Sequence, residues 1–323
     1  MTWRRSLARL TSLVATTLAI LALAGQGLSA SAAPEPALET PTSTLASALT
    51  CPTTFTHPDR EPVLLVHGTV SNAAESWGWG VAPALRDQGF DVCTVDLPDY
   101  SRPDIQVSAE YVVHAIDAIY QSTGRKVDVV GHSQGNLQLR WAVKWWPHLQ
   151  ARVDDMVNLA NPANGIVGGS AFCIVPCIPA ATQFSLGSRF LDALNAGDPT
   201  PGPISYTSIY SLTDEAILPF TTAIVDGAKN ISVQSVCPGR IVTHVGFLYD
   251  SVAFRLTVDA LSHSGSASPG RMPFGKCLDV NLPGVTVAEA TAATAVVVAA
   301  AGVRLVGGAT AWVEPPLKAY AAG

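Results

Sequence analysis

The chain has 323 residues, a formal net charge of −6 and only 14% charged residues. Beyond its first residues it has no basic stripe or arginine cluster, which excludes the electrostatic footprint of a nucleic-acid-binding protein. Because 48% of the residues are hydrophobic, the chain can bury the large core of a single α/β domain.

Residues 1–32 have the three regions of a secretory signal peptide. Three arginines precede an apolar stretch at 10–24, and small residues follow at 30–33. Threonines and serines within the apolar stretch disfavour a membrane anchor, and the surroundings of Arg4-Arg5 match a twin-arginine signal poorly. We predict cleavage after Ala32 and a secreted, extracellular protein.

Residues 33–50 are rich in proline, alanine, serine and threonine, which predicts a flexible N-terminal segment before an ordered domain at 51–323. The apolar run at 62–66 predicts a strand covered on both faces. Further strands are predicted at 90–95, 127–130, 153–160 and 204–210, and in a broken region at 231–243. Helices are predicted from Ser108 to Gly124 and at 136–146. This alternation predicts an α/β fold with a mostly parallel central sheet flanked by helices.

Two later segments are expected beside the site. Residues 165–188 are glycine-rich and apolar and follow a strand, where the carboxyl edge of an α/β sheet forms its site. We predict a lid or pocket wall there, with a plain surface loop as the alternative. Residues 288–303 are rich in alanine and valine and predict a helix over the domain or near the site, too short for a membrane span.

The pentapeptide Gly131-His132-Ser133-Gln134-Gly135 lies between the predicted strand at 127–130 and the predicted helix at 136–146. A buried strand, G-x-S-x-G and a helix, in this order, are typical of the nucleophile elbow of α/β-hydrolases. The flanking glycines are needed because side chains there would clash with the neighbouring strand and helix. We predict Ser133 as the nucleophile and the backbone N–H of Gln134 as an oxyanion donor.

A serine nucleophile needs a histidine base, and in this fold the chain order is serine, acid, histidine. Of the seven histidines, four precede Ser133, and His148 ends the next helix. His244 lies between a predicted strand end and a turn, whereas His263 lies in a polar loop. Because a catalytic base must be held rigidly, we predict His244.

The acid should lie between Ser133 and His244 at a strand end. Asp214 follows the predicted strand at 204–210, with Glu215 as its competitor. We favour Asp214 from strand geometry. The second oxyanion donor should come from the loop after an early strand, where Gly68 permits close approach and Thr69 offers its N–H and hydroxyl.

The six cysteines predict three disulfides in an exported chain, but spacing alone leaves 15 pairings open. No C-x-x-C pair exists, and no histidine lies at ligand spacing beside a cysteine. We therefore predict no metal site.

The chain resembles the Candida antarctica lipase B-like family of α/β-hydrolases, as a secreted bacterial-type homologue, from about Leu49 to the C-terminus. Separated motifs carry this resemblance in the same order along the chain. They lie at 48–51, 62–66, 108–113, 133–135, 210–215, 234–237 and 244–246.

The resemblance implies Ser133 as nucleophile, Asp214 as acid and His244 as base, with Thr69 and Gln134 as oxyanion donors. It also implies the disulfides Cys51–Cys93 and Cys237–Cys277. Cys173 and Cys177 have no counterpart in the type member, which leaves them to pair with each other.

Three residues are expected to contact the substrate. His132 stands where the type member has a tryptophan that shapes a specificity pocket. Ile217 and Leu218 lie just beyond the acid, where the family has other apolar residues.

Together these residues predict a secreted serine carboxylic ester hydrolase, most simply a triacylglycerol lipase that uses no cofactor and no metal. The alternatives are a short-chain esterase, a polyester hydrolase or a secreted acyltransferase with the same triad. A non-catalytic binding protein is disfavoured because no triad member is missing. The expected partners are an ester or lipid substrate and, transiently, a lipid–water interface, but no nucleic acid; no motif specifies an oligomeric state.

Overall fold

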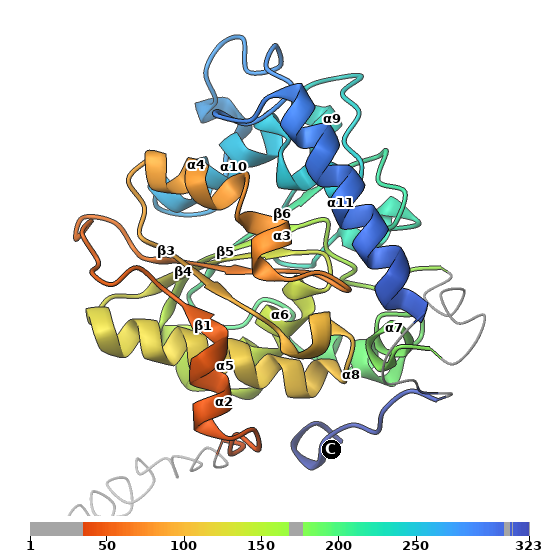
Figure 1. Ribbon diagram of the computed structural model, residues 1–323. Coiled ribbons are helices and arrows are strands. Elements are labelled where there is room, and N and C mark those ends of the chain that lie inside the picture. The colour runs from red at the N-terminus through yellow and green to blue at the C-terminus, as the bar shows by residue number, and fades with distance from the viewer. Residues whose placement is uncertain (1–34, 168–176, 307–310, 312, 323) are drawn as a thin grey trace, which may run out of the picture. The chain divides into compact units, whose positions relative to one another are not determined.

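A seven-stranded β-sheet with strand order β1-β3-β2-β4-β5-β6-β7 forms the centre of the fold. It is seen in a computed structural model that describes residues 35–167, 177–306, 311 and 313–322 (Figure 1). The predicted signal peptide therefore lies outside the described residues. The elements below belong to one unit, Pro36–Gly323.

Every strand pair in this sheet is parallel except β1 with β3. The central strands are almost entirely buried and rich in valine and leucine, as expected for strands covered on both faces. This confirms the predicted, mostly parallel sheet. The strands are β1 (Leu49–Thr50), β2 (Val63–Val66), β3 (Val92–Val95), β4 (Val127–His132), β5 (Val153–Leu159), β6 (Ser205–Tyr210) and β7 (Lys229–Ser232).

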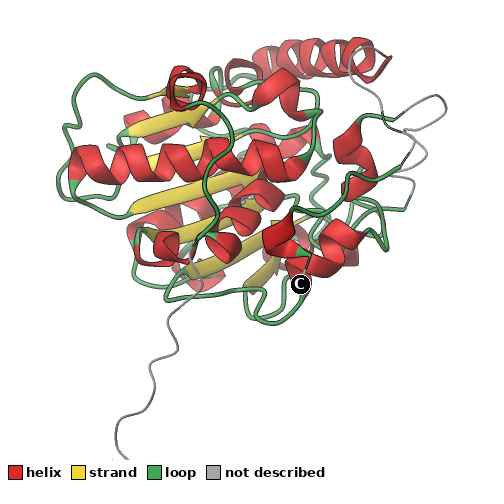
Figure 2. Ribbon diagram, turned by 90° about the horizontal axis from the view of Figure 1, so that it is seen from below, coloured by secondary structure: helices red, strands yellow, loops and turns green. Residues whose placement is uncertain are grey.

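Helices cover both faces of the sheet (Figures 1 and 2). In Figure 1, α2, α5 and α6 lie below the sheet, and α3, α4 and α10 lie above it. The helices are α2 (Thr42–Ala48), α3 (Ala73–Trp77), α4 (Val81–Asp87), α5 (Ile105–Thr123), α6 (Gly135–Trp145), α7 (Pro179–Gln183), α8 (Arg189–Asn195), α9 (Val233–Val236), α10 (Ser251–Ser262) and α11 (Val287–Val306). Short 3-10 helices lie at Pro98–Ser101, Pro147–Ala151, Phe220–Ala223, Val245–Leu248, Pro269–Arg271 and Ala319–Ala321.

The N-terminal boundary and one cap differ from the prediction. Packed secondary structure begins before Cys51, because α2 buries Leu45 and β1 pairs with β3. Residues 42–50 are therefore not a flexible segment. Helix α5 begins at Ile105, where the Asp104 carboxylate accepts the Gln106 N–H at 2.9 Å, and the expected cap Ser108 is buried inside the helix.

The expected strand region at 231–243 is also different. β7 ends at Ser232, α9 follows, and residues 240–243 form no strand. Instead, the Thr213 side chain takes the place of a strand partner. Its Oγ1 donates to the Val242 carbonyl at 3.1 Å and accepts from the Val242 N–H at 3.0 Å. The segment that leads to His244 is thus held by a side chain.

Helix α11 is longer than the predicted 288–303. Within the described part of the chain, its residues Val287–Leu305 form the one helix long and apolar enough to cross a membrane by length and composition, and 6% of this stretch is buried. Valines 287, 296, 298 and 303 are exposed. The helix therefore carries an apolar surface that the rest of the described chain leaves open.

A pair of buried carboxyl groups lies at the amino edge of the sheet. Asp128 is near the start of β4 and Asp155 near the start of β5, and the Asp155 N–H donates to Asp128 Oδ1 at 3.2 Å. Burial, together with the charge of Asp154, raises the pKa of Asp155 to about 7. Burial and the charge of Asp155 also raise the pKa of Asp128 well above its ordinary value.

We therefore expect the Asp155→Asn variant to lose part of the pH dependence of stability. The unfolded carboxyl loses its proton near its ordinary pKa of 3.8, whereas the folded one keeps it up to about pH 7. The wild type should thus lose unfolding free energy as the pH rises from about 4 to about 7. Denaturant unfolding at several pH values should show a flatter profile for Asp155→Asn.

The matched control is Asp59→Asn, at an exposed loop position. It should keep the wild-type profile. A wild-type profile in Asp155→Asn would contradict the raised pKa of this carboxyl.

Candidate active site

Ser133 lies in the tight turn between β4 and α6. Its φ is +54°, a left-handed conformation that costs a non-glycine residue about 1–2 kcal/mol. Its N–H donates to the Leu159 carbonyl at 2.9 Å. A Cβ on Gly131 would lie 2.3 Å from Asn136 Oδ1, and a Cβ on Gly135 would lie 2.4 Å from the Val66 carbonyl oxygen. These contacts explain why both flanking positions need glycine.

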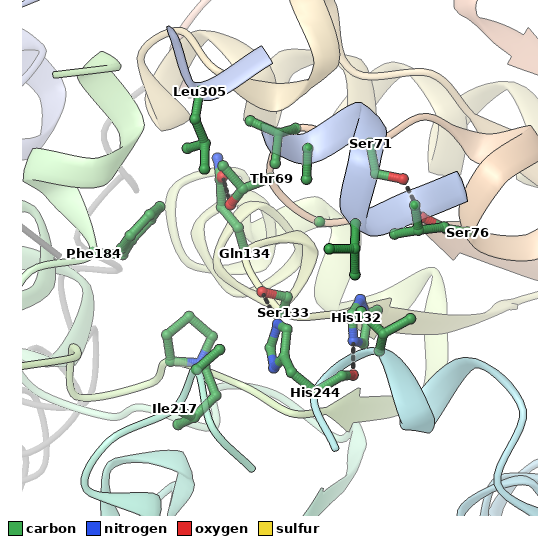
Figure 3. A pocket seen from close by; sticks show the side chains of 18 of the residues that line it. Thr69, Ser71, Ser76, His132, Ser133, Gln134, Phe184, Ile217, His244 and Leu305 are labelled. Atoms are coloured by element: carbon green, nitrogen blue, oxygen red, sulfur yellow. Dashed lines mark hydrogen bonds between the residues drawn. The ribbon is translucent and has the colours of Figure 1, made fainter. Parts of the chain in front are cut away.

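His244 lies between Ser133 and Asp214, and Figure 3 shows its contact with Ser133. Its Nε2 is 2.9 Å from Ser133 Oγ, and its Nδ1 is 3.0 Å from Asp214 Oδ2 and 3.2 Å from Asp214 Oδ1. The structure therefore brings together the three residues predicted as nucleophile, base and acid. With Nδ1–H donating to the carboxylate, Nε2 is free to accept the serine proton.

Asp214 and Glu215, the two candidates for the acid, contact different parts of His244. Asp214 is buried, and its Oδ1 accepts the N–H groups of Ala216 and Ile217 at 2.8 and 2.9 Å. Burial by itself raises the pKa of Asp214, but His244 and these N–H groups outweigh it, so the pKa lies below its ordinary value. Glu215 accepts the backbone N–H of His244 at 2.9 Å, so it contacts the main chain of the base.

The loop after β2 lies directly against the nucleophile. A Cβ on Gly68 would lie 2.8 Å from Ser133 Cβ. Thr69 Oγ1 donates to the Gln134 side-chain oxygen, which links the two predicted oxyanion residues. Among the described residues, the backbone N–H groups of Thr69 and Gln134 have no acceptor. Both are therefore free to donate to a substrate oxyanion.

His67 is a residue whose role the sequence analysis missed. It is fully buried; its Nδ1–H donates to the Gly68 carbonyl, and its Nε2 accepts the Leu97 N–H, each at 2.9 Å. Burial lowers its pKa, which favours this neutral form. The Gly68 carbonyl and the Thr69 N–H belong to one peptide group, so His67 orients the donor. The sequence signal that could have indicated this role is the position of His67 between an apolar strand and Gly68.

An apolar cavity of about 430 Å³ opens at Ser133. Its walls come from segments far apart in the sequence. Ile166, Ile178 and Phe184 come from the region predicted as a lid, whose residues 168–176 lie outside the described part, and α11 adds Val297 and Leu305.

Of the predicted substrate contacts, His132 and Ile217 line the cavity and Leu218 does not. Leu218 is 47% exposed, so its prediction was wrong. The physical reason is the turn after Asp214, whose carboxylate binds the Ile217 N–H. This turn leaves Ile217 facing the cavity and Leu218 in solvent. His263, the rejected base, contacts Asp259 at the end of α10.

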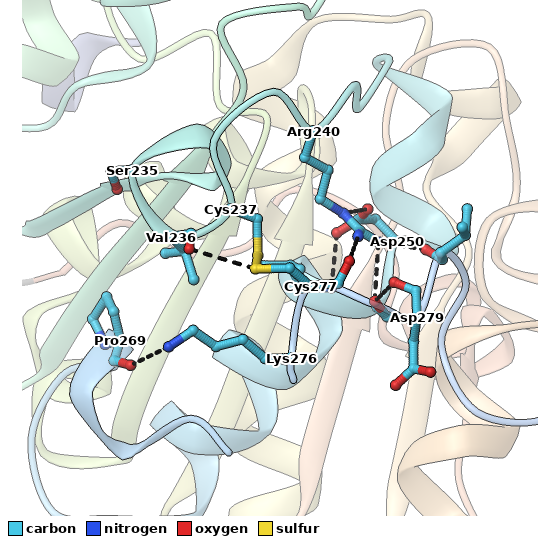
Figure 4. Close-up of a disulfide and its surroundings, with 12 residues drawn as sticks. Ser235, Val236, Cys237, Arg240, Asp250, Pro269, Lys276, Cys277 and Asp279 are labelled. Carbon is cyan, nitrogen blue, oxygen red and sulfur yellow. Dashed lines mark hydrogen bonds and ion pairs between the residues drawn. A yellow bond between two sulfur atoms is a disulfide. The ribbon is translucent and has the colours of Figure 1, made fainter. Parts of the chain in front are cut away.

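The loop that carries His244 is braced by a disulfide and a buried ion pair (Figure 4). Cys237 and Cys277 form a disulfide, and Arg240 Nε lies 2.6 Å from Asp250 Oδ2. Cys51 and Cys93 form a second disulfide, between the start of the domain and β3. The predicted pair Cys173–Cys177 involves a residue outside the described part.

Comparison with known proteins identifies the family of this chain. Residues 60–237 match the family described as lipase (class 2). The chain belongs to this family. Lipase B of Pseudozyma antarctica is 30% identical to this class 2 lipase over 298 residues, which are 89% of this chain and 86% of that protein.

Solved structures support the fold of this class 2 lipase. Aspergillus fumigatus lipase B matches with a TM-score of 0.83 and 29% identity, over 92% of this chain and 76% of that one. A mature Bacillus licheniformis lipase matches with a TM-score of 0.52 and 18% identity, over 65% of this chain and 94% of that one. The predicted α/β-hydrolase fold is confirmed, and the protein is a lipase-family hydrolase.

Substitutions can distinguish the roles of the Asp214 and Glu215 carboxylates. We expect Asp214→Asn to lower kcat for ester hydrolysis by about 10³- to 10⁴-fold, because an amide can favour the wrong tautomer of His244. Glu215→Gln should lose less than about 10-fold, since its side-chain oxygen can still accept the His244 N–H. Steady-state kinetics of both variants would measure this. An equal or larger loss in Glu215→Gln would assign the acid to Glu215.

Proposed function

We propose that this class 2 lipase is a secreted serine ester hydrolase that cleaves triacylglycerols through an acyl-enzyme at Ser133. The observation that carries the proposal is the continuous set of contacts from Asp214 through His244 to Ser133, with the distances given above. This set opens into an apolar cavity.

In the first half of the reaction, the Ser133 hydroxyl attacks the ester carbonyl carbon while His244 Nε2 takes the hydroxyl proton. The carbonyl oxygen becomes an anion that accepts the free N–H groups of Thr69 and Gln134. Asp214 stabilises the imidazolium formed on His244. His244 then gives its proton to the alcohol oxygen as the carbon–oxygen bond breaks, and the acyl group stays on Ser133.

In the second half, water attacks the acyl-enzyme. His244 Nε2 removes a proton from the water, and the same two N–H groups hold the second oxyanion. The bond to Ser133 Oγ breaks, His244 returns the proton to the serine, and a carboxylic acid leaves. These steps use only side chains and backbone groups of this chain.

The walls of the cavity support a lipid ester as substrate. Val70, Phe184, Ile217, Val297 and Leu305 surround the space next to Ser133. A hydrocarbon chain buried there gains about 0.8 kcal/mol for each CH₂ group. An acyl chain therefore binds better as it lengthens, until the cavity is filled.

The exposed valines of α11 support a transient contact with a lipid–water interface. Val298 is 56% exposed and also lines the cavity, so this apolar surface continues to the entrance of the site. We infer that α11 touches the lipid phase while the substrate enters.

Secretion is supported by the sequence of the first 32 residues and by the disulfides Cys51–Cys93 and Cys237–Cys277. Disulfides form and persist in oxidising compartments outside the cytosol. We propose that the signal peptide is removed after Ala32 and that the enzyme acts outside the cell.

The nucleophile is tested by Ser133→Ala. The variant should lose ester hydrolysis by several orders of magnitude, because no acyl-enzyme can form. Its unfolding midpoint should stay close to that of the wild type or rise, since alanine removes only a hydroxyl. Turnover by folded Ser133→Ala at the wild-type rate would exclude Ser133 as nucleophile.

The substrate class is tested with a series of p-nitrophenyl esters from acetate to palmitate, together with emulsified triglyceride. We expect kcat/KM to rise with acyl length up to a plateau and the emulsion to be hydrolysed. Preference for acetate without turnover of the emulsion would favour a short-chain esterase. Transfer of the acyl group to an added alcohol in preference to water would favour an acyltransferase.

A further inference from the structure

His132 contacts the base itself. Its Nε2 lies 3.0 Å from the backbone carbonyl oxygen of His244, and the two rings are 4.8 Å apart between centroids (Figure 3). The Trp77 indole packs edge-on against the His132 ring, with centroids 6.3 Å apart. His132 is 6% exposed, so its ring is held by these neighbours and offers little surface to a substrate.

The contact with a carbonyl oxygen defines which nitrogen of the His132 ring carries a hydrogen. A carbonyl oxygen only accepts hydrogen bonds, so Nε2 of His132 must carry the hydrogen. Burial, with the nearby His244 as a second cause, lowers the pKa of His132 to about 3. The ring is therefore a neutral donor over the range in which the enzyme would work. A neutral ring adds no charge repulsion when His244 becomes an imidazolium.

No strand holds His244, and the His132 donor adds a tether to its main chain. Residues 240–243 are not part of the sheet, and His244 directly precedes the 3-10 helix Val245–Leu248. Three of its four polar groups are tethered by residues other than the nucleophile: the imidazole Nδ1–H by Asp214, the backbone N–H by Glu215 and the carbonyl by His132. The last tether comes from the residue directly before the nucleophile.

We propose that His132 is a positioning residue for the base: its Nε2–H holds the His244 main chain at hydrogen-bonding distance from Ser133. The inference rests on the proposed roles of Ser133 and His244. It assigns to the residue before the serine a task in aligning the triad, in addition to its place in the cavity wall. A positioning residue affects every substrate alike, whereas a wall residue affects substrates by their shape.

Two substitutions separate these roles. His132→Phe keeps a planar ring but has no donor, and His132→Gln keeps an N–H that can reach the carbonyl. The substrates are a series of esters that share the same acyl group and differ in the size of the alcohol group. We expect His132→Phe to lower kcat by about 10- to 100-fold for every alcohol, with KM changed by less than about 2-fold. His132→Gln should recover at least part of that loss.

Ile217→Ala is the comparison variant, because Ile217 lines the cavity and its hydrocarbon side chain cannot donate to the His244 carbonyl. It should change KM to an extent that depends on the substrate. A loss in His132→Phe that appears in KM and varies with the alcohol would overturn the positioning role. So would a His132→Phe enzyme with wild-type kcat.

A second measurement is independent of activity and of how well the variants fold. Nitrogen-15 NMR of histidine-labelled wild-type protein should show His132 as the neutral Nε2–H tautomer from pH 8 down to about pH 5. The Nδ1–H tautomer, which leaves no hydrogen on Nε2, would overturn the proposal. Failure of the wild type to hydrolyse any ester would instead refute the proposed function, and the NMR result would still report on the contact.

Discussion

The site depends on the close approach of two backbone segments at Ser133. The loop after β2 passes so near the elbow that a Cβ on Gly68 would meet Ser133 Cβ at 2.8 Å, and a Cβ on Gly135 would meet the Val66 carbonyl at 2.4 Å. Only glycine allows these distances. The approach places two free N–H groups, of Thr69 and Gln134, next to one hydroxyl. A bulkier turn would separate the nucleophile from its proposed oxyanion donors.

The parallel sheet brings the other groups to the same edge. The parallel strands β2, β4 and β6 end close to Thr69, Ser133 and Asp214, in line with the rule that α/β sheets bind ligands at their carboxyl ends. His244 reaches this edge in a different way. Its segment is fixed by the Thr213 hydroxyl and the Arg240–Asp250 ion pair. The base is therefore held by side-chain contacts, whereas the nucleophile is held by the sheet.

An apolar cavity lies at this edge of the sheet. The cavity takes its walls from the loop after β2, from the region of residues 165–188 and from α11. Helix α11 is anchored by Arg304, which pairs with Glu75 on α3 and donates to the Val70 carbonyl at 2.9 Å. The helix is thus joined to the loop that carries the proposed oxyanion donor. Lipid contact and catalysis would share one wall.

Much of the site could be predicted because its signals are local. Strand, glycine, serine, glycine and helix follow one another within a few residues. Chain order and the place of His148 at a helix end reduced seven histidines to His244 and His263. Where the prediction failed, a partner that the pattern does not reveal had decided the outcome. Residues 240–243 look like a strand, but both backbone groups of Val242 bond to the Thr213 hydroxyl. Ser108 looks like a cap, but Asp104 takes that place.

The sequence by itself determined the class of fold and predicted the nucleophile and the base proposed here, because a turn that needs glycine and an alternation of strands and helices are local patterns of neighbouring residues. Only the tertiary structure showed which part of His244 each of the adjacent residues Asp214 and Glu215 contacts. It also decided what Leu218 and His132 do. Leu218 faces solvent, and His132 reaches a carbonyl 112 residues away. Such contacts depend on how separate segments pack, which no local pattern specifies.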